Sequence, residues 1–201
     1  MTDPAESFEA FEAEVLNIRR AWEFGSWISG NHPGAPDAIV FIKAAPTFHW
    51  YASQGLLTYV VLGLSRLADP TTDHQGRENL TLERIHQETD FTHCSDRDSR
   101  AGHAMTKALE IIRSDDFKKA RNKALAHNDL KVILAKDALV EMEVIRKGVQ
   151  WVACFHARIK AVREGTGISL ATGKGVFPRY ADVQVCEDEI VNLLVRLQRS
   201  Q

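Results

Sequence analysis

The chain has 201 residues, of which 44% are hydrophobic and 26% are charged, a composition typical of one globular domain with a substantial core. Its 25 Lys and Arg against 27 Asp and Glu give a formal net charge of -2, which excludes a protein that binds nucleic acid through its overall charge. Any site for an anion must therefore be local. The three cysteines form no CxxC pair, which argues against a disulfide framework or a thiolate zinc site and favours a reducing cytoplasm.

Neither a signal peptide nor a membrane span is expected. The N-terminus is acidic, the reverse of a secretory signal. The most apolar stretch, residues 56–64, is far shorter than the roughly 20 residues that cross a bilayer. We interpret it as part of a buried core helix.

Apolar residues three and four positions apart predict a long first helix over residues 4–29. Asp3 is its expected N-cap, with Pro4 and Glu6 in the first turn. Turn-forming residues at 31–34 are expected to end it.

The second periodic run, residues 48–67, is apolar nearly all round and predicts a central helix that ends before Pro70. Gly55 and Gly63 lie eight residues apart on one face. Because glycine inside a helix costs about 1 kcal/mol relative to alanine, we expect a close helix crossing at this face.

The next segments alternate between polar and periodic stretches. Residues 72–79 and 94–100 are expected to be loops, with Thr81 as the cap of a short helix between them. The apolar run at 105–125 predicts a helix with a kink or a fresh cap at 114–116, ending near His127.

The last third of the chain contains one more long helical stripe, over residues 136–163. A glycine-rich linker is expected at 164–181 and a closing helix at 182–199. No stretch alternates with a period of two. The predicted fold is therefore all-α, an antiparallel bundle of four long helices with short extra helices, in a single domain over 1–201 with its core at about 48–163.

Several possible sites have a simpler structural interpretation. The string GISLATGKG at 167–175 lacks both the spacing and the preceding strand of a phosphate-binding loop, and is interpreted as a solvated linker. His156, on an apolar stripe, is interpreted as a hydrogen-bonded core residue. The acidic residues at 115–116 and 187–189 suit helix caps and first turns. The densest group of metal-ligand residue types consists of His86, His93, Cys94 and His103. Their spacing is irregular. We therefore predict that the protein has neither a metal nor a cofactor.

The phrase RNKALAHND, residues 121–129, ends an amphipathic helix and lies close to Arg113, Lys118 and Lys119. An Arg followed by a His after four to six residues occurs twice in the chain. The other copy, Arg97 to His103, lies in a polar segment without apolar periodicity. The first copy is therefore the stronger candidate for a functional site.

This phrase resembles the HEPN superfamily, whose active members carry an Arg, a polar residue and then a His four to six residues after the Arg; here these are Arg121, Asn122 and His127. LGLSRLADP at 62–70 and ENLTLERI at 78–85 are similar to the abortive-infection (AbiU-type) branch. The resemblance covers about 48–163 and implies a helical bundle that usually dimerises. Many HEPN proteins are metal-independent endoribonucleases, whereas others bind nucleotides or serve as non-catalytic modules.

The residue types suit metal-free cleavage of RNA, which needs an acid, a base and positive charge on the phosphorane. His127 titrates in the right range, Arg121 can hold two phosphate oxygens, and Asn122 can orient the phosphate or the imidazole. Positions six apart on a straight helix are separated by about 120°, so Arg121 and His127 converge only if the helix ends or distorts near Ala126.

Nearby residues have two interpretations each. Lys118, Lys119 and Lys123 would attract the RNA backbone or simply form a solvated helix face. Asp129 would hold the tautomer of His127 or serve a local turn. In the structural alternative for the motif, Arg121 pairs with an acid such as Asp116 and His127 caps the helix C-terminus.

Asp129 stands where HEPN toxins paired with a nucleotidyltransferase commonly carry a modified tyrosine, so control through that tyrosine is not expected. The sequence predicts a cytoplasmic, metal-independent endoribonuclease of a prokaryotic defence or toxin–antitoxin system, with RNA as substrate and an antitoxin or other defence protein as a further partner. It would act as a homodimer with both His127 side chains in one cleft. The alternatives are a non-catalytic HEPN module that binds a nucleotide or partner protein, or a structural subunit.

Overall fold

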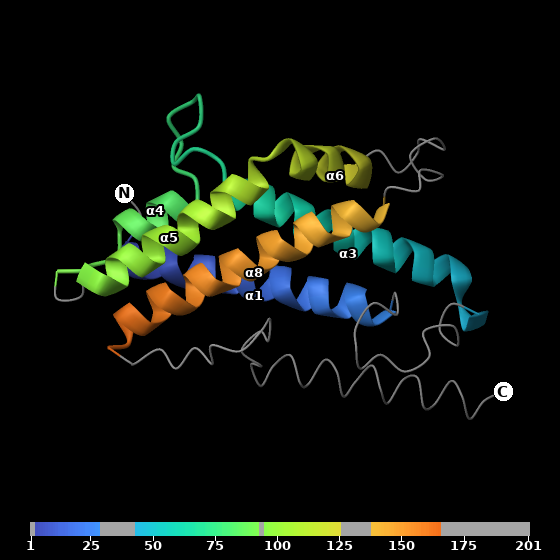
Figure 1. The fold of residues 1–201 in the computed structure, drawn as a ribbon, viewed down its shortest axis with the longest axis horizontal. Coiled ribbons are helices and arrows are strands. Elements are labelled where there is room, and N and C mark those ends of the chain that lie inside the picture. The colour runs from blue at the N-terminus through green and yellow to red at the C-terminus, as the bar shows by residue number, and fades with distance from the viewer. Residues whose placement is uncertain (1–2, 29–42, 93–94, 126–137, 166–201) are drawn as a thin grey trace.

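The computed structural model describes residues 3–28, 43–92, 95–125 and 138–165. These residues form six helices and no strand, so the all-α prediction is confirmed: α1 (Pro4–Ile28), α3 (Pro46–Leu67), α4 (Leu82–Gln87), α5 (Ser95–Ile112), α6 (Asp115–Leu125) and α8 (Ala138–Arg163). Figure 1 shows α1, α3, α5 and α8 running lengthwise in alternating directions, with α4 and α6 as shorter additions. This is the expected bundle of four long helices.

Helix α1 begins and ends close to the predicted positions. The Asp3 carboxylate accepts a hydrogen bond from the backbone N–H of Ala5 at 2.9 Å, as an N-cap does. Phe11, Val15 and Ile18 are buried on one face, which gives the stripe that the spacing indicated. The expected stop at 31–34 lies outside the described residues.

Helices α1 and α3 cross closely at Gly63. A Cβ atom on this glycine would lie 2.8 Å from two side-chain carbons of Ile18 and 3.1 Å from the Glu14 carboxylate. The expected close crossing is therefore confirmed here. Among the described residues no such crossing is seen at Gly55, where a Cβ would meet nothing within 4 Å, because the N-terminal half of α3 exposes this face.

Helix α3 is less buried than its composition indicated. Its C-terminal half is in the core through Val60, Val61, Leu64 and Leu67, whereas several large apolar side chains of the helix are exposed: Phe48, Trp50, Tyr51, Tyr59 and Leu62. Among the described residues, no helix has the length and apolar character needed to cross a membrane.

The segment between α3 and α4 is the polar loop that was expected. The Asp73 carboxylate accepts hydrogen bonds from the N–H groups of Gln75 and Arg77, each at 2.8 Å, and Gly76 takes the positive φ of 76° that closes the turn. The Thr81 hydroxyl then accepts from the N–H of Arg84 at 3.2 Å. Thr81 is therefore the N-cap of α4, as predicted.

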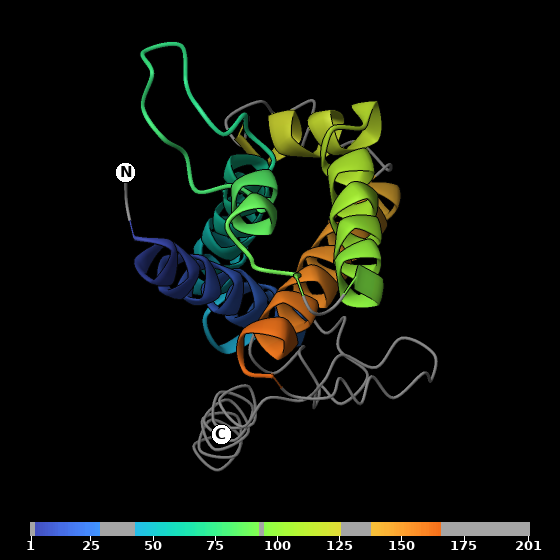
Figure 2. The same cartoon turned by 90° about the vertical axis from the view of Figure 1, so that its left-hand side faces the viewer.

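Helix α5 begins earlier than predicted, because residues 95–100, expected to be a loop, form its first turns. Asp96 and Asp98 lie in the first turn, where carboxylates are stabilised by the helix dipole. Ala101, Ala104 and Ala108 are fully buried at spacings of three and four, and α5 lies alongside α8 (Figure 2). These small side chains let the two helices approach closely. A search for large apolar residues alone does not detect such a stripe of alanines.

The hydroxyl group of Ser114, between α5 and α6, forms hydrogen bonds to the backbone of both helices. The Ser114 Oγ donates to the carbonyl oxygen of Ile111 at 2.6 Å and accepts from the N–H of Phe117 at 3.2 Å. The predicted fresh cap at 114–116 is confirmed, with Ser114 as the capping residue.

Helix α8 agrees with the predicted stripe over 136–163, as far as the described residues reach. The linker, the GISLATGKG string and the closing helix lie beyond residue 165, outside the described part of the chain. The acidic residues at 187–189 lie there too.

Candidate functional site

Helix α6 carries the described part of the RNKALAHND phrase. It packs against α3, α5 and α8 through Phe117 and Ala120, which are buried. Figure 1 shows α6 along one side of the bundle. One face is thus fixed on the core, and the other faces solvent.

The solvent face of α6 is basic and polar. Lys118, Lys119 and Asn122 are exposed, and Arg121 is half-buried. Because residues three and four apart are neighbours on a helix, Lys118 lies one turn before both Arg121 and Asn122. The structure therefore brings these three predicted site residues onto one surface, with Lys119 at its edge.

Two acids at the start of α6 pair with the lysines. Lys118 Nζ donates to Asp115 at 3.0 Å, and Lys119 Nζ lies 3.6 Å from Asp116. The hydrogen bond from Lys118, together with the charge of Lys118, lowers the pKa of the Asp115 carboxyl. These exposed pairs are each worth little, so an anionic ligand can replace either carboxylate.

Among the described residues, Arg121 does not pair with Asp116, the acid that the structural alternative gave as an example. Asp116 faces Lys119, and no ion pair or hydrogen bond joins Arg121 to any residue in the described ranges. Because no described residue pairs with it, Arg121 is available to bind a phosphate in this part of the structure.

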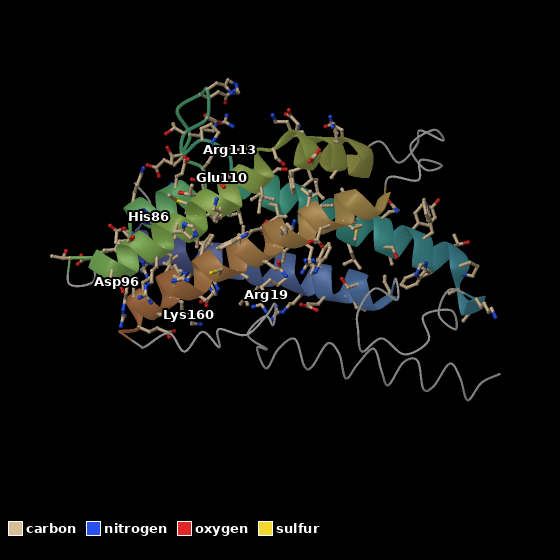
Figure 3. All side chains as sticks on the ribbon, in the orientation of Figure 1. Arg19, His86, Asp96, Glu110, Arg113 and Lys160 are labelled. Atoms are coloured by element: carbon tan, nitrogen blue, oxygen red, sulfur yellow. The ribbon has the colours of Figure 1, made fainter. Side chains whose placement is uncertain are left out.

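Arg113 has a different role from its neighbours in the sequence. Its Nε and Nη2 donate to the carbonyl oxygen of Ala68 at 3.2 and 2.9 Å, and Nη2 also lies 3.2 Å from Glu83. Figure 3 shows Arg113 at the end of α5. Arg113 therefore caps the C-terminal end of α3 and is not part of the basic surface on α6.

The remaining predicted site residues are only partly described. Helix α6 includes Lys123, but its side chain is outside the described set, as are His127 and Asp129. The predicted convergence of Arg121 and His127 stays a prediction.

The other Arg and His pair in the sequence serves packing. Arg97 donates to the carbonyl oxygen of Ala161 at 3.2 Å, which ties α5 to α8. His103 is exposed and makes an edge contact with Trp151. The described contacts of this copy are therefore structural.

Nothing in the described ranges groups three metal-ligating residue types. Of the four residues considered as ligands, His86 lies 3.1 Å from Asp98 and His103 contacts Trp151. His93 and Cys94 lie outside the described residues.

A buried polar cluster at the far end of α8 was only partly predicted. His156 is fully buried, its Nε2 lies 3.3 Å from Glu12 Oε1, and its ring stacks on Phe8. Lys160 Nζ donates to the same oxygen at 2.7 Å; Figure 3 labels Lys160 on α8. His156 is thus the hydrogen-bonded core histidine that was expected. Only the i, i+4 spacing of His156 and Lys160 in the sequence hints at a shared acid.

Burial lowers the pKa of His156, and the positive charges of Lys160 and Arg19 lower it further, against the opposing effect of Glu12. For Glu12, burial favours a raised pKa, but the hydrogen bond and charge of Lys160 outweigh it, so its pKa is lowered. The cluster therefore contains a neutral imidazole and a carboxylate paired with an ammonium group. It stabilises the α1–α8 contact and is not part of the α6 surface.

The helical bundle and the phrase at the end of α6 define a HEPN-type protein. Within this class, a family model for HEPN proteins described as AbiU2 matches residues 5–147, and the chain belongs to this family. The protein is accordingly a HEPN module of abortive-infection type. The family model therefore also covers α1, whereas the resemblance found in the sequence analysis covered only about 48–163. The matched residues include the whole RNKALAHND phrase at 121–129. No curated protein and no solved structure gives a significant match.

Proposed function

We propose that this protein is a metal-independent endoribonuclease of a prokaryotic defence system, with Arg121, Asn122 and His127 as its catalytic residues. The observation that supports this most directly is the position of Arg121 and its lack of a carboxylate partner among the described residues. Arg121 lies in the family's phrase, within the residues that match the AbiU2 model, and no described carboxylate neutralises it.

The basic surface of α6 suits the substrate. Within the described ranges, Lys118 and Lys119 pair with exposed carboxylates one turn away, so RNA phosphates can replace Asp115 and Asp116 at small cost. Lys123, one turn after Lys119, extends the same run. Binding through these few cations agrees with a molecule whose overall charge is slightly negative.

In this mechanism, Arg121 binds two non-bridging oxygens of the scissile phosphate and stabilises the charge of the phosphorane. An imidazole of His127 removes the proton of the 2′-hydroxyl group, and an imidazolium protonates the 5′-oxygen. The 2′-oxygen attacks phosphorus, and the bond to the 5′-oxygen breaks. The products are a 2′,3′-cyclic phosphate and a 5′-hydroxyl end, so no external co-reactant is consumed.

The assignment is tested by incubating the purified protein with single-stranded and structured RNA in excess EDTA and analysing the ends of the products. We expect cleavage with 2′,3′-cyclic phosphate ends. Loss of cleavage in the chelator, or products with 3′-hydroxyl ends, contradicts the mechanism.

Variants of the motif separate catalysis from binding. Arg121→Ala and His127→Ala should each lower turnover at least a hundredfold, since each removes a group that acts in the transition state. Arg100→Ala and His103→Ala are matched controls, because both residues are exposed on α5. If RNA is bound but not cut, and only Arg121→Ala weakens binding, the protein is a non-catalytic binding module.

The acid and the base require two imidazoles, whereas the motif supplies one per chain. A two-fold axis at the motif would place both His127 side chains in one cleft. A purified heterodimer of wild-type and His127→Ala chains should then retain much less than half of the wild-type rate. A rate of half or more means that each chain holds a complete site.

A further inference from the structure

Aromatic side chains are exposed in the first two turns of α3. Phe48, Trp50 and Tyr51, which we call the aromatic turn, are 60%, 43% and 71% exposed. Rings of this size each bury about 150–250 Å² when they are covered, so leaving three of them in water is unfavourable. Exposed apolar groups that lie together in this way commonly mark a binding surface.

The charge around the aromatic turn suits a polyanion. Of the six described helices, α3 alone contains no Asp or Glu. Lys43, which is exposed, is the one charged side chain between residues 43 and 65. The carboxylate of Glu14, on α1, contacts α3 further along, at Tyr59 and Arg66. A phosphate beside the aromatic turn would therefore meet a cation and no carboxylate from α3.

The fold brings the aromatic turn to the end of the bundle where the candidate site lies. Figure 1 shows α3 beginning, α6 ending and α8 beginning at this same end. Helix α6 packs against α3, and its solvent face carries Lys118, Arg121 and Asn122. RNA held by α6 can therefore extend along this end of the bundle toward the aromatic turn.

The three rings are spread around the helix and do not form one flat face. At about 100° per residue, Tyr51 lies about 100° from Trp50 and about 60° from Phe48 around the helix axis. A stable protein partner needs about 800 Å² of continuous surface on each side. The bases of a single strand, in contrast, are splayed out and stack on separate aromatic side chains. The arrangement of the rings therefore favours unpaired bases over a protein surface.

We propose that the aromatic turn of α3 is a stacking subsite for the unpaired bases of single-stranded RNA. This rests on the proposed function for the RNA and deepens it, because the subsite selects single-stranded over double-stranded substrate. In a duplex the bases are stacked on one another, so they offer no free face to the rings. The basic surface of α6 binds phosphates, and the aromatic turn determines which part of an RNA is presented to Arg121.

Equilibrium binding of oligonucleotides without 2′-hydroxyl groups tests the subsite, because the proposed mechanism cannot cleave them. We expect Tyr51→Ala to raise the Kd for a single strand by about fivefold or more, the loss of one stacked base. The Kd for a duplex of the same length, and for a strand with abasic positions, should not change. Equal affinity of the wild type for the abasic strand and the complete strand overturns the subsite, as does an equal loss of affinity for the duplex in Tyr51→Ala.

Conservative variants separate stacking from a simple apolar contact. Tyr51→Phe keeps the ring and should bind single strands like the wild type. Tyr51→Leu keeps an apolar side chain without a ring and should lose affinity as Tyr51→Ala does. Leu62→Ala is the matched control, because Leu62 is exposed on α3 but has no ring, and it should leave the Kd unchanged. A Tyr51→Leu protein with the affinity of the wild type overturns the proposal, since an apolar contact would then be sufficient.

RNA cleavage and the mass of the protein in solution are measured on the same variants. Binding of single strands that depends on Tyr51, without cleavage of RNA, supports the subsite and contradicts the proposed enzyme. Cleavage that keeps the wild-type rate and the wild-type preference for unpaired regions in Tyr51→Ala supports the enzyme and overturns the subsite. A changed mass in Tyr51→Ala with no change in oligonucleotide affinity assigns the aromatic turn to a protein contact, which also overturns the subsite.

Discussion

Gly63 faces Ile18 so closely that a Cβ atom at position 63 would lie 2.8 Å from two carbons of the Ile18 side chain. Exchange of Gly63 for alanine would favour the helix by about 1 kcal/mol, but overpacking at such a crossing costs typically 1–3 kcal/mol. We expect Gly63→Ala to lower the free energy of unfolding by up to about 2 kcal/mol, the difference between these two effects, measured by urea denaturation. Gly25→Ala is the control, because its Cβ would make an ordinary contact of 3.8 Å with Leu56. A Gly63→Ala protein as stable as the control would mean that α1 and α3 separate easily.

The cap at Ser114 should control the stability of α6. Ser114→Ala removes both the acceptor for the Phe117 N–H and the donor to Ile111, and we expect a loss of about 1 kcal/mol. Ser114→Asp keeps an acceptor for the N–H and should recover most of that loss. Chemical denaturation measures both variants, and an unaffected Ser114→Ala protein would show that the core contacts of Phe117 hold α6 without a cap.

Arg113 and Lys118 lie five residues apart and should respond differently to substitution. Arg113→Ala leaves the Ala68 carbonyl without its two donors, so we expect a loss of about 1–3 kcal/mol in stability with RNA affinity unchanged. Lys118→Ala breaks only an exposed ion pair and should cost less than about 1 kcal/mol. If the proposed function holds, Lys118→Ala weakens RNA binding and reduces the salt dependence by roughly 0.7 in the log–log slope. The opposite pattern would assign the RNA contact to Arg113.

The cluster at Glu12 predicts a pH dependence of stability. Because the pKa of His156 is lowered in the folded protein, the unfolded chain takes up a proton first as the pH falls below about 6.5. The free energy of unfolding should therefore decrease from pH 6.5 down to the lowered pKa, by at most about 1.4 kcal/mol per pH unit from this group. The lowered pKa of Glu12 adds a further loss at more acidic pH, below its ordinary value.

His156→Gln should flatten the first part of this pH profile, even though the loss of stacking on Phe8 makes the protein less stable at neutral pH. His103→Gln, an exposed exchange on α5, should leave the profile of the wild type intact. The measurement is urea denaturation at several pH values between 7.5 and 5. An identical slope in wild type and His156→Gln would mean that His156 does not titrate differently on folding.

The sequence predicted the helices where large apolar residues recur or a cap is evident, as at Thr81 and Ser114. It did not predict the first turns of α5, because Ala101 and Ala104 give a weak periodic signal although both are fully buried. It also overestimated the burial of α3, because the composition of a helix does not show which of its apolar side chains other segments cover; Tyr51 is 71% exposed.

For the candidate site, the sequence named Lys118, Arg121 and Asn122 separately, and their helical spacing alone is enough to place them on one surface. The role of Arg113 was not predictable. Its acceptor, Ala68, lies 45 positions away, and only the packing of α3 against the end of α5 brings the two together. The same holds for Glu12 and Lys160, which are separated by 148 positions.

The buried alanines of α5 have a consequence for how this chain can diverge in evolution. A larger side chain at Ala101, Ala104 or Ala108 would push α5 away from α8, the helix that carries His156 and Lys160. These small, chemically inert residues should therefore tolerate fewer substitutions than the charged residues of α6. The exposed ion pairs of α6 contribute little to folding. Among relatives with this fold, the α5 alanines should change slowly, and, if the proposed function holds, the lysines of α6 should change with the RNA that each protein cleaves.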